Sequence, residues 1–155
     1  MDYEETGILS IEEIQIPSKE RMAQRAFAVL ECPQQIPCDP CVKACKFGAI
    51  TKSSLISPPK INFDKCTGCA TCVSKCPGLA IFVVNMNYSP KEALVTMPYE
   101  LEPPKVKERV KVLDRGGKVV GSGKVIKVRL EKDRTGIISI ALEKSLAMVV
   151  RNIRK

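Results

Sequence analysis

Hydrophobic and polar residues alternate with a period of two in three segments near the end of the chain, at residues 106–112, 126–131 and 138–142. Valine, isoleucine and leucine occupy most of the alternate positions, and lysine, arginine or small residues lie between them. Such alternation puts apolar side chains on one face of a β-strand and polar ones on the other. The pattern therefore predicts three half-buried antiparallel strands.

Turn-forming residues separate these segments. Residues 114–117 match a hairpin turn, residues 121–123 a bend or bulge, and residues 132–136 a further turn. Beyond them, apolar residues recur at helical spacing, at Leu142, Leu146, Val149, Val150 and Ile153. We therefore expect residues 105–155 to form a small antiparallel β-barrel with a C-terminal helix.

Earlier in the chain the apolar runs are short. Residues 26–30 and 79–85 predict two strands that lie beside each other, with short helices and strands between them. Residues 1–24 mix isoleucines with glutamates without a core-sized pattern, and predict an extended acidic arm. Residues 86–104 carry several prolines and predict a linker.

Composition and charge divide the chain in the same way. With 155 residues, 45% of them apolar and 5% aromatic, it can form one ordinary domain or two small ones. Residues 1–97 carry ten basic and ten acidic side chains, whereas residues 98–155 carry fifteen and seven, so the net charge of +8 lies in the last part. A strongly basic strand region favours docking on an acidic surface.

The longest uninterrupted apolar run, residues 79–84, is six residues, far short of the roughly 20 that span a bilayer. The sequence therefore predicts no membrane insertion. It begins with acidic residues and shows no apolar export signal. We expect a cytoplasmic protein in a reducing compartment, plausibly of an anaerobe.

Eight cysteines carry the candidate chemistry. Four of them, followed by Pro77, have the spacing C-x2-C-x2-C-x3-C-P, and a second quartet precedes them; in order they are Cys32, Cys38, Cys41 and Cys45, then Cys66, Cys69, Cys72 and Cys76. Closely spaced cysteines let one loop turn three sulfurs toward a single cofactor, and the spacing is that of [4Fe-4S] ligands. The sequence predicts two [4Fe-4S] clusters.

Residues 25–85 resemble bacterial-type two-cluster ferredoxins. The resemblance implies that the fourth cysteine of each quartet serves the other cluster. One cluster would then be held by Cys32, Cys38, Cys41 and Cys76, and the other by Cys66, Cys69, Cys72 and Cys45. It also implies an α+β fold in which a ferredoxin-like βαββαβ domain precedes the predicted barrel.

The first quartet departs from the family at two positions. Five residues separate Cys32 from Cys38 where the family has two, which makes Cys32 the least secure ligand. Lys46 stands where the family has a proline, which is favourable but not required at a helix start. The alternatives for eight cysteines are disulfides, which suit a small secreted domain, and two zinc sites, which more often use two separated C-x2-C pairs.

Residues around the cysteines are expected to set the cluster environment. We predict a dry apolar shell made by Ile36, Val42, Ile50, Ile61, Phe63, Val73 and Ile81. Four lysines adjoin ligands and either raise the cluster potential or are ordinary solvated surface residues; they are Lys43, Lys46, Lys65 and Lys75.

The whole layout resembles the small iron–sulfur subunit of multisubunit flavin-dependent amine dehydrogenases of the proline, hydroxyproline or sarcosine type. The resemblance lies in the architecture and in residues 31–41. It implies FAD-binding dehydrogenase partner subunits in a hetero-oligomer, with the clusters relaying single electrons. Two clusters of about 2− each would leave a net charge of about +4, unlike an acidic diffusing shuttle.

Two other functions stay open, a freestanding ferredoxin and a nucleic-acid-associated iron–sulfur protein. Nucleic acid is disfavoured because the basic segment from residue 98 onward has one aromatic, Tyr99, and so no stacking platform. The chain has no histidine and no phosphate-binding glycine motif between a strand and a helix. We therefore predict no catalytic site on this chain, which would be a non-catalytic subunit of an oxidoreductase.

Overall fold

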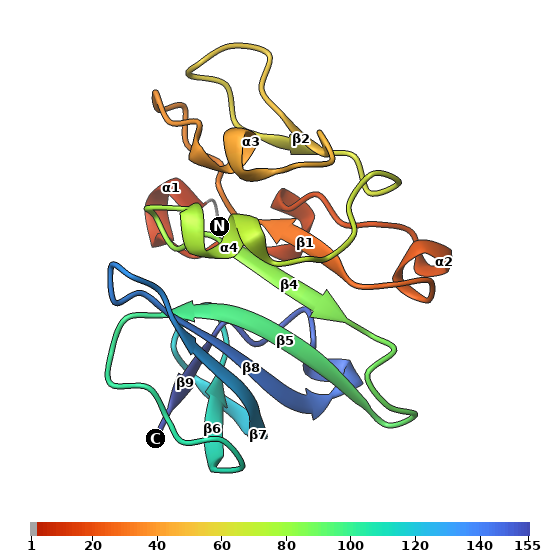
Figure 1. Cartoon of the computed structure of the whole chain (residues 1–155), viewed down its shortest axis with the longest axis vertical. Helices are drawn as coiled ribbons and strands as arrows, with labels where there is room; N and C mark the ends of the chain where they lie inside the picture. The colour runs from red at the N-terminus through yellow and green to blue at the C-terminus, as the bar shows by residue number, and fades with distance from the viewer. Residues whose placement is uncertain (1–2) are drawn as a thin grey trace.

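A computed structural model describes residues 3–155 (Figure 1), so that the first two residues of the predicted arm lie outside the described part. The helices are short: α1 Tyr3–Thr6, α2 Lys19–Met22, α3 Pro40–Ala44 and α4 Thr71–Lys75, with 3-10 turns η1 Ile11–Glu13 and η2 Lys144–Leu146. The strands are β1 Phe27–Leu30, β2 Ile50–Thr51, β3 Lys60–Ile61, β4 Ile81–Asn85, β5 Glu92–Tyr99, β6 Arg109–Leu113, β7 Val119–Leu130, β8 Gly136–Glu143 and β9 Asn152–Arg154.

Seven strands form one antiparallel sheet in the order β1-β4-β5-β8-β7-β6-β9, and β2 pairs with β3 separately. Between residues 27 and 85 the elements follow in the order strand, helix, strand, strand, helix, strand. The helices α3 and α4 lie on the side of β1 and β4 where the cysteine loops gather (Figure 1). The assignment of this unit to the ferredoxin-like fold stays a prediction.

Strands β1 and β4 are buried on both faces and separate two cores. Phe27 and Val29 point into a core formed with β5 to β9, whereas Ala28 and Leu30 point into a second core that contains Cys66 and Cys72. The same alternation holds in β4, which pairs with β1 from Phe27 opposite Val84 to Leu30 opposite Ile81. A strand with two buried faces reads as a continuous apolar run, which explains the sequence signal.

Residues 92–99, which the sequence assigned to the linker, form strand β5 instead. It pairs with β4 on one side and with β8 on the other, and so makes the sheet continuous across the predicted domain boundary. Its alternate residues Ala93, Val95 and Met97 are fully buried. Buried residues alternate in β5 as in any strand with one buried face, but the prolines between residues 86 and 104 favoured a linker in the sequence.

The strands after residue 105 also differ from the predicted barrel with a helix. They belong to the same sheet as β1, and the strand order of this sheet is open and ends at β9. The predicted terminal helix is replaced by η2 and β9, which pairs with the outer edge of β6. The spacing of apolar residues did not distinguish a terminal helix from a terminal strand. The strand forms because it pairs with backbone groups at the edge of β6 that would otherwise lack partners.

The predicted turns agree with the structure more closely than the predicted strands do. At residues 114–117 the Asp114 carboxylate accepts hydrogen bonds from Gly116 and Lys118, as a hairpin turn requires. Strand β7 has an irregularity between Val125 and Lys127, which moves the buried position to Val125. Beyond the irregularity Val128 packs against the core as predicted, but Leu130, the last residue of β7, is exposed against the prediction.

The arm lies against the first strands rather than forming a unit of its own. Ile14 is buried in the core of the large sheet. The Gln15 side chain donates to the carbonyl of Ile61 at 2.8 Å and accepts from its N–H at 3.0 Å, as a neighbouring strand would. Within residues 3–155 no helix has the length and apolar character needed to cross a membrane.

A buried charge cluster joins the end of β1 to the C-terminal strands. The Glu31 carboxylate, with its side chain 7% exposed, is paired with Arg115 at 2.7 Å and with Arg151. The Arg151 guanidinium lies 5.0 Å from the centre of the Phe82 ring. Burial lowers the pKa of Arg151 and the charge of Glu31 opposes this, so the ion pair keeps a buried cation satisfied.

We predict that Glu31→Gln, which leaves two buried guanidiniums without a counter-charge, lowers the free energy of unfolding by about 3–5 kcal/mol. Denaturation of anaerobically prepared protein measures this. The matched control is Glu102→Gln, whose carboxylate pairs with Lys155 at 3.7 Å but whose side chain is 91% exposed. Equal losses in both variants would contradict a special role for the buried cluster.

Candidate iron–sulfur centre

Four cysteines from both quartets line one small pocket between α3, β2 and α4. They are Cys45, Cys66, Cys69 and Cys72, and the apolar wall includes Ala28, Phe47, Ile50 and Ile61. Cys45 follows α3, whereas the other three come from the loop that leads into α4 and from α4 itself. The structure thus brings the fourth cysteine of the first quartet to three cysteines of the second.

The other four cysteines gather at a second place. Cys32, Cys38 and Cys76 line a second groove, together with Pro33 and Ala80. Cys41 interacts electrostatically with all three of these thiols, and with Cys76 most strongly. Strand pairing explains this. Leu30, two residues before Cys32, lies opposite Ile81, five residues after Cys76.

The thiols are crowded into apolar surroundings. Burial, together with the neighbouring thiols Cys66, Cys69 and Cys45, raises the pKa of Cys72 to about 12. Burial also raises the pKa of Cys41. Thiolates become stable in such a place only when positive charge arrives with a metal. The donor set therefore fits a cofactor that supplies iron.

Backbone N–H groups point at three of the sulfurs. Ala49 donates to Cys45 Sγ at 3.3 Å, Ala80 to Cys76 Sγ at 3.4 Å, and Ala28 to Cys66 Sγ at 3.4 Å. Hydrogen bonds to cluster sulfurs are one of the levers by which a protein sets the reduction potential. The first two bonds have the same spacing of four residues. They belong to a sequence duplication, residues 45–50 and 76–81, in which cysteine is followed by alanine and isoleucine at the same distances.

The duplication extends to the backbone. Gly48 and Leu79 each lie three residues after the fourth cysteine of their quartet, and both have positive φ, 64° and 54°. Glycine adopts this conformation freely, whereas leucine is strained there. The repeat of conformation without repeat of residue type shows that the turn geometry is imposed by its surroundings.

Two arginines, Arg21 of the arm and Arg25 just after it, hold the loop of the second quartet in place. Buried Arg21 donates to the carbonyl of Phe63 at 2.8 Å and to that of Cys66 at 2.9 Å, and Arg25 donates to the same Cys66 carbonyl at 3.0 Å. Sequence reasoning missed both residues, because neither the burial of Arg21 in a short polar helix nor the contacts of exposed Arg25 leave a signal in the local sequence. The arm thus fixes a predicted ligand loop.

The predicted apolar shell is largely in place. Ile50, Ile61, Val73 and Ile81 are buried in the core that contains Cys66 and Cys72, and Val42 and Phe63 pack against it. Ile36 is an exception, since it lies on the surface at 42% exposure. Its loop carries the extra residues of the first quartet and projects from the core.

The four lysines beside cysteines lie on the surface: Lys43, Lys46, Lys65 and Lys75 are all exposed. Lys43 pairs with Asp39 at 3.3 Å while remaining 78% exposed. Solvent screens such charges, so the surface reading is favoured over a tuning role.

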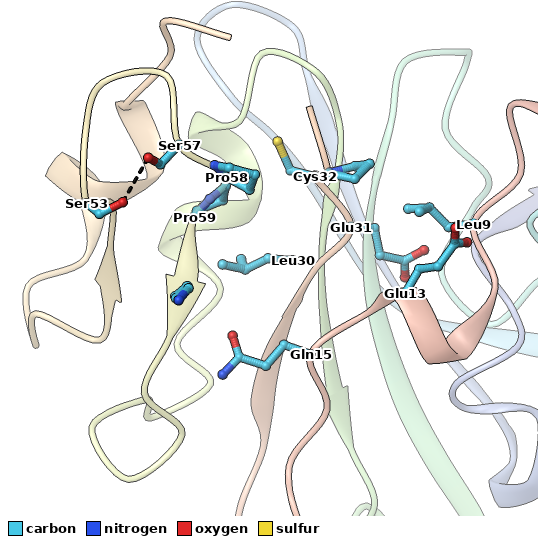
Figure 2. A pocket seen from close by; sticks show the side chains of 12 residues that line it. Leu9, Glu13, Gln15, Leu30, Glu31, Cys32, Ser53, Ser57, Pro58 and Pro59 are labelled. Atoms are coloured by element: carbon cyan, nitrogen blue, oxygen red, sulfur yellow. Dashed lines mark hydrogen bonds between the residues drawn. The ribbon is translucent and has the colours of Figure 1, made fainter. Parts of the chain in front are cut away.

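A groove of about 700 Å³ opens beside Cys32, between the arm and the loop that follows β2 (Figure 2). Leu9, Glu13 and Glu31 lie on one side of it, and Pro58 and Pro59 on the other. The hydroxyl of Ser53 donates to that of Ser57 at 2.8 Å and closes the far loop on itself. Cys32 is therefore approachable from this groove.

Comparison with known proteins gives one match. A family model described as a 4Fe-4S binding domain matches residues 59–82, which contain the second cysteine motif. This segment is a ferredoxin-type iron–sulfur domain, and it indicates a [4Fe-4S] cluster with an electron-transfer role. No curated protein and no solved structure matches the chain.

Within residues 3–155 no three cysteine, aspartate or glutamate side chains are grouped so that they could hold a single metal ion. A [4Fe-4S] cluster presents four irons rather than one, each to its own thiolate. The two sets of four cysteines therefore fit a cluster better than a single metal ion.

Gly68 is the most constrained residue of the second loop. Its φ is +71°, and a Cβ there would lie 2.4 Å from the Cβ of Ala26. We predict that Gly68→Ala displaces the loop of Cys66 and Cys69 and abolishes the cluster there, which iron and acid-labile sulfide assays measure. Gly78→Ala is the matched control beside Cys76, because no atom lies within 4 Å of the added carbon. Full iron content in Gly68→Ala would contradict the assignment.

Proposed function

We propose that this chain is an electron-transfer subunit that binds two [4Fe-4S] clusters with crossed ligands. Cys32, Cys38, Cys41 and Cys76 would hold one cluster, and Cys66, Cys69, Cys72 and Cys45 the other. The observation that carries the proposal is the position of Cys45, which lines one pocket with the three cysteines of the second quartet. The 4Fe-4S match to residues 59–82 supports the nature of the cofactor.

Double variants distinguish crossed from uncrossed ligation. With crossed sets, Cys38→Ala combined with Cys76→Ala removes two ligands of one cluster and leaves the other intact. Cys72→Ala combined with Cys76→Ala removes a ligand from each cluster. We predict that iron and sulfide fall by about half in the first variant and almost completely in the second, as fully thiolate-ligated clusters require.

The uncrossed arrangement predicts the reverse order of the two variants, so the same pair of measurements refutes one of them. Zinc in place of iron and sulfide, in protein isolated without oxygen, would contradict both arrangements and support the zinc alternative.

When bound, each cluster accepts and releases one electron at a time. The chain's own residues provide the thiolates, the N–H donors to sulfur and the apolar shell between α3, α4 and β4. Each helix connects the two cysteine sets: α3 contains Cys41 and is followed by Cys45, and α4 contains Cys72 and is followed by Cys76. We propose that this arrangement passes electrons one by one between a donor and an acceptor, with no reaction of a substrate on this chain.

We further propose that the donor is an FAD-containing subunit of a dehydrogenase that oxidises a small amine or amino acid. The support is the resemblance of the layout and the basic surface of β6 and β7. Arg109, Lys111, Lys127 and Arg129 are exposed there, and a protein with an acidic face would complement them. Arm and basic strands would then anchor the subunit in a complex.

Isolation of the tagged chain from its source organism tests this partner. We predict a second polypeptide with flavin absorbance, which is released when Lys111 and Lys127 are both changed to glutamate. Reversal of exposed Lys91, on the loop before β5, is the control and should leave the complex intact, because it lies away from β6 and β7. Isolation of the chain alone would favour a freestanding ferredoxin, and salt-sensitive copurification of RNA or DNA a nucleic-acid-associated protein.

A further inference from the structure

The side chain of Lys52 holds the loop between Cys32 and Cys38, which contains the extra residues, in place by hydrogen bonds. The Lys52 ammonium, from the loop after β2, donates to the carbonyls of Ile36 at 3.4 Å, Cys38 at 2.5 Å and Leu55 at 2.7 Å. An ammonium has three N–H groups, so these acceptors use its full donor capacity. The insertion is therefore joined to a second loop at a predicted ligand.

The charge of Lys52 has no anionic partner in the described part of the chain. Its three acceptors are neutral carbonyls, and none of the ion pairs between residues 3 and 155 involves it. The side chain is half-buried, unlike Lys43 and Lys46. Its charge also acts on the thiol of Cys32. A cluster bound by four thiolates, those of Cys32 and Cys38 among them, would supply negative charge that complements it.

The second half of the duplication has no cation at the matching position, although Arg21 and Arg25 donate to the carbonyl of Cys66 there. Lys52 lies seven residues after Cys45, and the residue seven positions after Cys76 is Val83, which is buried among apolar side chains. The two halves therefore differ at this position by one positive charge.

We propose that Lys52 is a positioning residue for the first cluster: it holds the Cys32–Cys38 loop in place and makes that cluster easier to reduce than it would be without this charge. The inference rests on the proposed two-cluster function. Positive charge close to a cluster stabilises its reduced, more negative form, and a half-buried charge is screened less than an exposed one.

The experiment is a redox titration of the anaerobic protein, followed by electron paramagnetic resonance, with iron and sulfide assays. In Lys52→Met one cluster should bind its electron about tenfold more weakly, a fall of about 59 mV, while the other keeps its potential. Lys52→Arg, which retains the charge, should restore most of the shift. Lys43→Met removes an equal but exposed charge and should leave both potentials unchanged.

Loss of the first cluster alone in Lys52→Met, with half of the iron kept and recovery in Lys52→Arg, would also support the positioning role. The inference is overturned if both potentials move together, if both clusters are lost, if neither iron nor potential changes, or if Lys43→Met has the same effect. Wild-type protein with a single cluster would overturn the two-cluster function and this inference with it. Two clusters that do not respond to Lys52→Met overturn the inference alone.

Discussion

The pairing of β1 with β4 is the constraint on which the rest of the structure depends. Residues 27–30 and 81–84 are far apart in the sequence, and their register sets the chain before β4 beside the chain after β1. Cys32 and Cys76 meet for this reason. The inner N–H of Ala28, on the same strand, reaches the sulfur of Cys66 in the other cysteine pocket. One pair of strands thus organises both cysteine sets.

Burial on both faces explains how such short strands stay in place. One face of β1 and β4 packs on the cysteine loops and helices, and the other on the large core of β5 to β9. A one-residue slip would exchange the two faces of a strand and bring Phe27 to the cysteines, so the register is strongly specified. The C-terminal strands are therefore part of the support of the cysteine loops, rather than a module attached by a linker.

Buried charges link these layers where apolar contacts alone would not. Arg21 joins the arm to the loop of Cys66 through backbone carbonyls, and Glu31, the residue before Cys32, pairs with Arg115 and Arg151. Each buried polar group needs its partners in one geometry, since an unmatched charge in the interior is costly. These contacts consequently fix the two ends of the chain against the cysteine region, and they lie beside the residues on which the proposed clusters depend.

The sequence by itself determined the chemistry of the centre and the strands that flank it. The spacing of the second quartet identified the iron–sulfur motif, and the apolar runs at residues 26–30 and 79–85 identified β1 and β4, because both signals are local. Tertiary structure alone decided that residues 92–99 join the sheet, that residues 152–154 form a strand, that Arg21 and Lys52 lie beside the cysteine loops, and that Glu31 is buried against two arginines. Those outcomes depend on which backbone edges and carbonyls are left without partners once distant segments meet, and no local pattern of residues contains that information.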